Sequence, residues 1–150
     1  MDNINFREAT INDIEQIHVV RNSVTENSLS NPDMITYDDY ISFLTVRGRG
    51  WVCEVNRRIV GFAIVDLRDD NIWALFLLPE FERKGIGRKL QTLMLDWYFS
   101  NEKDCVWLGT SPHTRAEEFY KKSGWKEIGQ NGTKEIKFQM TRKDWNQFIV

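Results

Sequence analysis

A strand, a tight glycine turn and a helix follow one another between residues 72 and 97, and this stretch constrains the fold more than any other. The apolar run Ile72 to Leu78 ends at Pro79, which lacks the N–H group that a strand ladder needs. After a charged turn comes Gly85-Ile86-Gly87, followed by apolar residues at helical spacing. Glycine lets the backbone turn tightly, and the first N–H groups of a helix point back at such a turn. The stretch therefore favours binding of an anion such as phosphate.

Two common nucleotide-binding motifs do not fit this turn. A Walker loop requires Gly-Lys-Ser/Thr, which is absent, and a Rossmann turn requires a third glycine where Leu90 stands, which argues against NAD. Two interpretations stay open: a phosphate site, or a turn whose glycines only permit close packing. A second Gly-x-Gly triplet, Gly48-Arg49-Gly50, leads into a strand, and we interpret it as a plain loop.

Length and composition indicate one globular domain over residues 1–150 that is large enough to bury a core. The formal net charge is −2, with acidic and basic residues interspersed, so neither a nucleic-acid partner nor a membrane is expected. No apolar run has the length of a membrane span, and the first residues lack the pattern of a signal peptide. Cys53 and Cys105 lie in apolar segments, which predicts buried thiols and a cytoplasmic protein. No metal is expected.

Hydrophobic periodicity predicts an α/β (α+β) fold with the element order β-α-α-β-β-β-α-β-α-β-β. From this order we expect a mixed sheet with helices on both faces. The expected strands cover residues 3–9, 51–55, 58–66, 72–78, 104–110, 125–128 and 134–140. The expected helices begin near residues 10, 36, 85, 114 and 141.

A second motif, HTRAEEFYKKSGW at residues 113–125, joins the glycine turn in a family pattern. Together they resemble the GNAT superfamily of N-acetyltransferases, whose turn has the form Arg/Gln-x-x-Gly-x-Gly/Ala and whose later motif runs Asn-x-x-Ala-x-x-Phe/Leu-Tyr-x-x-x-Gly-Phe. Glu82 departs from the usual Arg or Gln, and we expect its side chain to face away from phosphate. His113 replaces the usual Asn, and Trp125 replaces the usual Phe.

The resemblance implies the GNAT fold, a mostly antiparallel sheet of about seven strands in which two central strands splay apart, and acetyl-CoA as cosubstrate. Pantetheine would lie between residues 72–78 and 104–110, with the N–H of Leu77 or Leu78 on the thioester carbonyl and His113 on the arm. Tyr120 would be the general acid that protonates the CoA thiolate; the alternative is a tyrosine that only packs on the sheet. The pyrophosphate would be bound by the backbone of Arg83, Lys84, Gly85, Ile86, Gly87 and Arg88.

The implied reaction is direct transfer of an acetyl group to a primary amine of a small-molecule or amino-acid-like acceptor in a ternary complex. The acceptor would bind around residues 21–40, with Glu26 and Asn27 as contacts, and the acidic residues of this segment favour a cationic acceptor. The general base stays open among Glu26, Glu54 and Asp66. A protein acetyltransferase acting on lysine or an N-terminus and a non-catalytic acyl-CoA-binding module are the alternatives. The tail from Thr141 packs either on its own sheet or on a second subunit, and the latter predicts a homodimer.

Overall fold

The structure is a computed structural model that describes residues 2–149, so the two terminal residues of the predicted domain lie outside the described part. The chain divides into two compact units, one up to Met94 and one from Leu95 onward. The boundary lies within one helix, α3 (Ile86–Phe99). The extent of the predicted domain stays a prediction.

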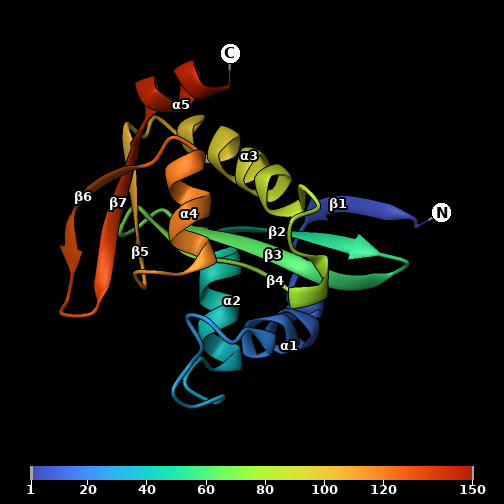
Figure 1. Ribbon diagram of the computed structural model, residues 1–150. Coiled ribbons are helices and arrows are strands. Elements are labelled where there is room, and N and C mark those ends of the chain that lie inside the picture. Colours follow the sequence, from blue (N-terminus) through green and yellow to red (C-terminus); the bar gives the residue numbers. More distant parts are fainter. Residues whose placement is uncertain (1, 150) are drawn as a thin grey trace. The chain divides into compact units, whose positions relative to one another are not determined.

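The first unit contains four antiparallel strands that pair in chain order (Figure 1). Its other elements are two helices and two short 3₁₀ turns, together with the first part of α3. The strands are β1 (Ile4–Glu8), β2 (Gly48–Val55), β3 (Arg58–Asp66) and β4 (Asn71–Leu77). The helical elements are η1 (Ile11–Asp13), α1 (Ile14–Ser23), α2 (Tyr37–Thr45) and η2 (Pro79–Phe81).

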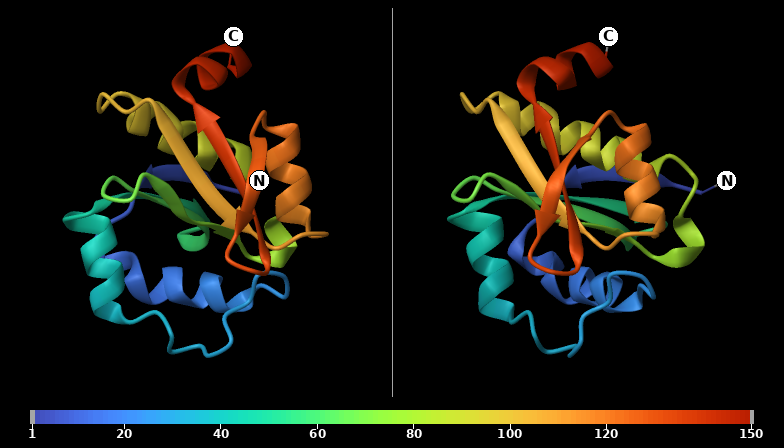
Figure 2. Two further views of the ribbon diagram at one scale, coloured as in Figure 1. Left: turned by 90° about the vertical axis from the view of Figure 1, so that its left-hand side faces the viewer. Right: turned by 60° about the vertical axis from the view of Figure 1, so that its left-hand side comes forward.

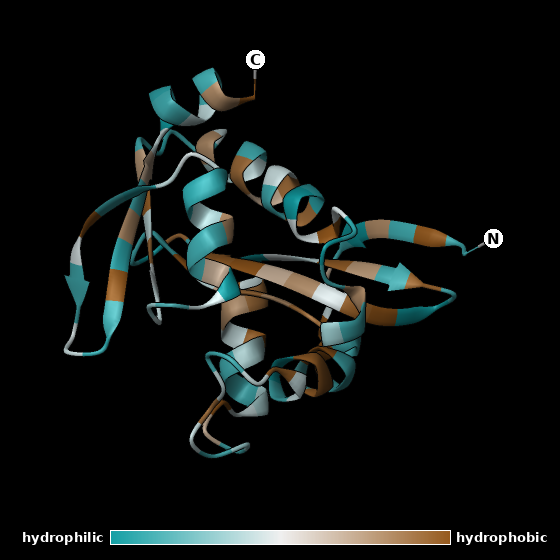
Figure 3. Cartoon of the chain, viewed as in Figure 1, coloured by the Kyte–Doolittle hydropathy of each residue, from teal (hydrophilic) through white to brown (hydrophobic). Residues whose placement is uncertain are grey.

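Helices cover both faces of these four strands. Helices α1 and α2 lie against one face, and the first turns of α3 lie over the other (Figures 1 and 2). At Gly61 of β3, a side chain would meet Leu77 and Leu90, so the α3 face approaches closely there. Phe62, the next residue, points to the opposite face and is fully buried. The apolar colouring of β3 in Figure 3 reflects burial of the strand between these two layers.

The second unit contains a three-stranded antiparallel ladder in the order β5, β7, β6. Trp145, which is 1% exposed, donates from its indole Nε1–H to Asp96 of α3 at 2.9 Å. This residue of the C-terminal tail therefore packs within its own unit. The elements are β5 (Cys105–Thr110), α4 (Arg115–Lys122), β6 (Lys126–Asn131), β7 (Glu135–Thr141) and α5 (Arg142–Phe148).

Seven strands and five helices appear in the predicted order among the described residues. The interpretation of Gly48–Gly50 as a loop is wrong, because these residues are the first part of β2. A Cβ at Gly48 would lie 1.8 Å from the carbonyl oxygen of Val65, so glycine is needed for close strand approach rather than for a turn. Strand β5 is not buried throughout but alternates, with Trp107 half-buried beneath the Lys137 ammonium.

Candidate functional site

The predicted phosphate turn connects β4 to α3 through two residues with left-handed backbone. Pro79 opens the 3₁₀ turn η2, in which Phe81 N–H donates to the Leu78 carbonyl at 2.9 Å. The chain then passes through Arg83 at φ +63° and Gly85 at φ +84° before α3 begins at Ile86. A Cβ at Gly85 would meet no atom within 4 Å, so the conformation, not the available space, favours glycine there.

The first turn of α3 presents backbone donors at this bend. Lys89 N–H donates to the Gly85 carbonyl at 3.2 Å, which is the first hydrogen bond of the helix. The N–H groups of Ile86, Gly87 and Arg88 precede it and have no acceptor within the helix. They sit at the positive end of the helix dipole, an arrangement that binds phosphate.

Three cationic residues of the same segment have exposed side chains. Arg83, Lys84 and Arg88 are all exposed, and the Lys84 ammonium lies 5.8 Å from the centre of the Phe81 ring. Glu82, the departure from the family pattern, is half-buried. The turn therefore combines helix N–H groups with three mobile positive charges, which suits a diphosphate.

Hydrogen bonding in β4 distinguishes Leu77 from Leu78, the two residues whose N–H groups were candidates to polarise the thioester carbonyl. Leu78 N–H donates to the Val60 carbonyl at 2.8 Å, so this group is already engaged. Pairing alternates along an antiparallel ladder, and Gly61 opposite Leu77 is therefore a pair without mutual hydrogen bonds. The N–H of Leu77 therefore points away from β3, toward the opposite edge of β4.

In the second unit, His113 and the start of α4 form a capped helix end. Thr114 is the N-cap, and its hydroxyl accepts from Glu117 N–H at 3.2 Å. The carboxylate of Glu117 in turn accepts the backbone N–H of His113 at 2.8 Å. His113 has φ +61° and an exposed side chain, so its backbone caps the helix while the imidazole stays accessible.

Tyr120 lies on the inner side of α4 and is 7% exposed. Its ring packs against Phe119, Trp125 and Phe138 at centroid distances of 5.3, 5.6 and 6.2 Å. Burial raises the pKa of the Tyr120 phenol above its ordinary value. The hydroxyl makes no hydrogen bond to any residue in the described part of the chain. The residue therefore packs as a core tyrosine, and its role as a general acid stays a prediction.

The predicted acceptor contacts lie between α1 and α2. Glu26 is exposed, and Asn27 is half-buried with φ +56°. Of the other two candidate bases, Glu54 accepts from Arg7 Nε at 2.6 Å and Asp66 accepts from Arg47 Nη2 at 2.5 Å. Both carboxylates are therefore already engaged in ion pairs with arginine.

Sequence reasoning missed a cluster on the α1–α2 face of the first unit. His18 Nδ1 lies 2.8 Å from the Tyr40 hydroxyl, and Asn22 Nδ2 lies 3.1 Å from His18 Nε2. Arg21, one turn from His18, places its guanidinium 4.0 Å above the ring centre of Phe76 in β4. Helical spacing could have paired His18 with Asn22, but no sequence pattern joins α1 to Tyr40 or Phe76.

Residues 2–149 contain neither a candidate metal site nor a candidate membrane span. No group of three or more His, Cys, Asp or Glu side chains there could hold a metal ion. None of the helices within this range is long and apolar enough to cross a membrane. Both cysteines are free, and burial raises the pKa of the Cys53 thiol to about 11. The cytoplasmic location stays a prediction.

Comparisons with known proteins agree on one family. The family model described as "Acetyltransferase (GNAT) family" matches residues 11–125. The chain resembles PaiA N-acetyltransferase from Thermoplasma acidophilum, solved in complex with coenzyme A, with 16% identity, a TM-score of 0.80, and coverage of 93% of this chain and 99% of that one. A GNAT-family acetyltransferase from Staphylococcus aureus gives 19% identity, a TM-score of 0.79 and the same coverage.

The fold also occurs in a relative that acts on protein. An N-acetyltransferase from Escherichia coli that acts on an alanine of a ribosomal protein has 17% identity and a TM-score of 0.70, with coverage of 93% of this chain and 92% of that one. No protein of curated function gives a significant sequence match. The structural matches confirm the predicted fold, and the family model spans most of the sequence. The chain therefore belongs to the acetyltransferase (GNAT) family.

Proposed function

We propose that this protein transfers the acetyl group of acetyl-CoA to a primary amine of a small-molecule or amino-acid-like acceptor. The observation that carries the proposal is the β4–α3 turn, where helix N–H groups and three exposed cations converge. Coenzyme A carries a diphosphate, which such a turn would bind. The PaiA relative, solved with coenzyme A, supports the same cosubstrate.

The reaction needs one bond made and one broken at the thioester carbonyl. The neutral amine nitrogen attacks the carbonyl carbon, the carbon–sulfur bond breaks, and CoA leaves as a thiolate that takes up a proton, while the nitrogen loses one. An N–H donor aimed at the developing oxyanion contributes about 3–4 kcal/mol in other enzymes. We assign this role to Leu77, since Leu78 N–H is engaged by Val60.

Tyr120 is the proposed donor to the departing sulfur. Burial raises the pKa of its phenol, so the hydroxyl stays protonated throughout the neutral range. A phenol is a weaker acid than a thiol, whose ordinary pKa is about 8.5. The hydroxyl therefore stabilises the thiolate first by hydrogen bonding. The attacking nitrogen becomes positively charged when it bonds to the carbonyl carbon, and the proton that it loses balances the proton that the thiolate takes up.

Tyr120→Phe tests this role. The substitution keeps the ring packing, so the dissociation constant of acetyl-CoA should stay nearly constant while kcat falls about 10²- to 10⁴-fold. Tyr98→Phe is the matched control, because the Tyr98 hydroxyl donates to the Cys105 carbonyl at 2.6 Å and so has a structural role. Unchanged turnover in Tyr120→Phe would remove the residue from the mechanism.

The activity itself is tested by calorimetry with acetyl-CoA and by thiol release with a panel of amines. We expect heat of binding, and thiol release with small amines. Binding without thiol release from any amine or peptide would instead identify an acyl-CoA-binding module. Release with peptides alone would identify a protein acetyltransferase. Absence of any binding heat would overturn the whole proposal.

A further inference from the structure

We infer that Arg21 binds a carboxylate of the acceptor, so that the substrate is an amine that also carries an acidic group. This inference rests on the proposed function and narrows its acceptor class. It concerns the α1–α2 face of the first unit, where the resemblance places the acceptor.

Arg21 is a half-buried cation without an anionic partner among the residues that the structure describes. Its guanidinium stacks on Phe76 at 4.0 Å, and its Nη1 atom is fully buried with no hydrogen-bond partner among residues 2–149. Desolvation by burial lowers the pKa of the Arg21 guanidinium. The electrostatic interaction with Tyr40 acts in the opposite direction and raises this pKa. A buried donor without an acceptor is costly to keep, which indicates that an acceptor arrives with a ligand.

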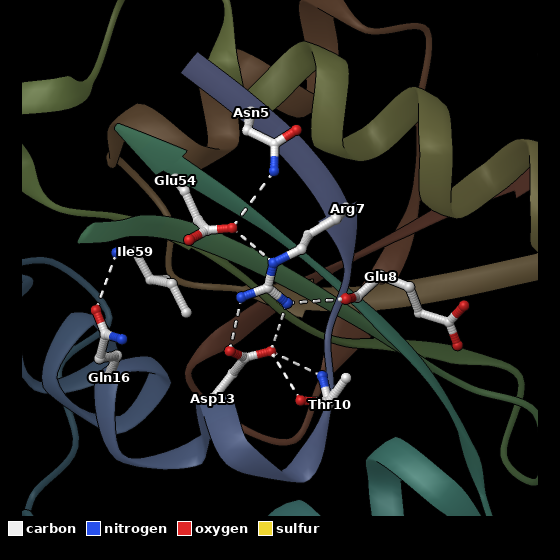
Figure 4. Close-up of polar contacts among 8 residues, drawn as sticks. All are labelled: Asn5, Arg7, Glu8, Thr10, Asp13, Gln16, Glu54 and Ile59. Atoms are coloured by element: carbon white, nitrogen blue, oxygen red, sulfur yellow. Dashed lines mark hydrogen bonds and ion pairs between the residues drawn. The ribbon is translucent and has the colours of Figure 1, made fainter. Parts of the chain in front are cut away.

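Two other half-buried arginines of this unit, Arg7 and Arg47, each have carboxylate partners. Arg7 donates to both carboxylate oxygens of Asp13 at 2.8 Å and also binds Glu54 (Figure 4). Arg47 is paired with Asp66 and Asp69 at 2.5 and 2.8 Å. Within residues 2–149, each of these two arginines thus has two carboxylate partners and Arg21 has none.

The surroundings of Arg21 suit a carboxylate. Tyr40, which is 1% exposed, is held by His18 at 2.8 Å and presents a phenol whose pKa burial raises to about 12, so it adds no negative charge. Phe76 supports the plane of the guanidinium, which fixes the direction of its donors. A planar guanidinium binds a carboxylate through two parallel hydrogen bonds.

An acceptor that carries both an ammonium group and a carboxylate also accounts for the acidic loop. The segment that follows Arg21 in the sequence is acidic and includes Glu26, Asp33 and the first turn of α2. Its negative charge favours an ammonium group. An amino acid carries both charges, so the acidic loop and Arg21 would each meet one of them.

The first test compares acceptors that differ only in charge. Thiol release is measured with 6-aminohexanoate against 6-aminohexanamide, and with amino acids against their amides. We expect the wild type to prefer the carboxylates at least tenfold in kcat/KM. Arg21→Gln should lower kcat/KM for the carboxylates about 10- to 100-fold and leave the amides unchanged. Arg21→Lys should restore part of the preference, and exposed Arg68→Gln is the matched control.

The second test needs no turnover. Hexanoate and hexanamide, which cannot be acetylated, are added to the acetyl-CoA complex and the melting temperature is followed. Hexanoate should stabilise the wild type and the Arg68→Gln variant but not Arg21→Gln. Equal effects of the two compounds on the wild type, or a hexanoate effect that survives in Arg21→Gln, would overturn the inference. Failure of the proposed function is read separately, from absence of acetyl-CoA binding or of thiol release.

Discussion

At the scale of single residues, we expect substitutions of Arg7 and of Arg21 to have opposite effects on the stability of the fold. Arg7→Met leaves Asp13, whose carboxylate is mostly buried, without its main partner, and should lower the free energy of unfolding by about 3 kcal/mol. Arg21→Met keeps a flexible apolar side chain on Phe76 and removes an unsatisfied buried donor. Because such a donor costs about 1–3 kcal/mol, Arg21→Met should be as stable as the wild type or more so. Urea unfolding of both variants checks this.

A strongly destabilised Arg21→Met variant would show that Arg21 is a structural residue whose partner is internal.

Asp13 adds a pH dependence to the comparison. The hydrogen bond from Arg7 lowers the pKa of its carboxyl below the ordinary value of 3.8. The stabilisation is therefore present above the unfolded pKa and is lost as the pH falls through the folded pKa. Arg7→Met should flatten this part of the acid-unfolding curve, whereas Arg21→Met should not.

At the scale of elements, substitutions at two glycines can show whether the β4–α3 turn binds phosphate or is an ordinary turn. Gly85 and Gly132 both have positive φ, at +84° and +66°, and a Cβ at either would meet no atom within 4 Å. Alanine at either site should cost about 1 kcal/mol of stability through backbone strain alone. Gly85→Ala should also weaken coenzyme A binding, because it shifts the donors of the first α3 turn. Gly132→Ala, in the β6–β7 turn, should not.

Calorimetry on the two variants decides the point. A wild-type affinity for coenzyme A in Gly85→Ala would mean that glycine at position 85 serves only the conformation of the turn and not phosphate binding. Equal loss in both would mean that the affinity follows global stability.

The same turn shows how far sequence reasoning reaches. Pro79, Gly85 and the apolar face of α3 are local signals, so the strand, turn and helix were predictable. Which of Leu77 and Leu78 offers a free-pointing N–H group was not predictable, because this depends on the pairing of β4 with β3. The strand character of Gly48 depends likewise on the approach of Val65. The unpaired state of Arg21 depends on what the whole fold places around it.

At the scale of the whole molecule, the glycine turn predicts which part of coenzyme A stabilises the protein. A ligand that binds only the folded state at 100 times its dissociation constant adds about 2.7 kcal/mol. For a chain of 150 residues this corresponds to a rise in melting temperature of about 5–10 °C. Coenzyme A should produce this rise, and pantetheine, which lacks the diphosphate, should produce little at the same concentration. Equal shifts would mean that the pantetheine arm supplies the affinity. Since the interaction of exposed Arg83, Lys84 and Arg88 with the diphosphate is screened by ions, the shift should also decrease as salt is raised.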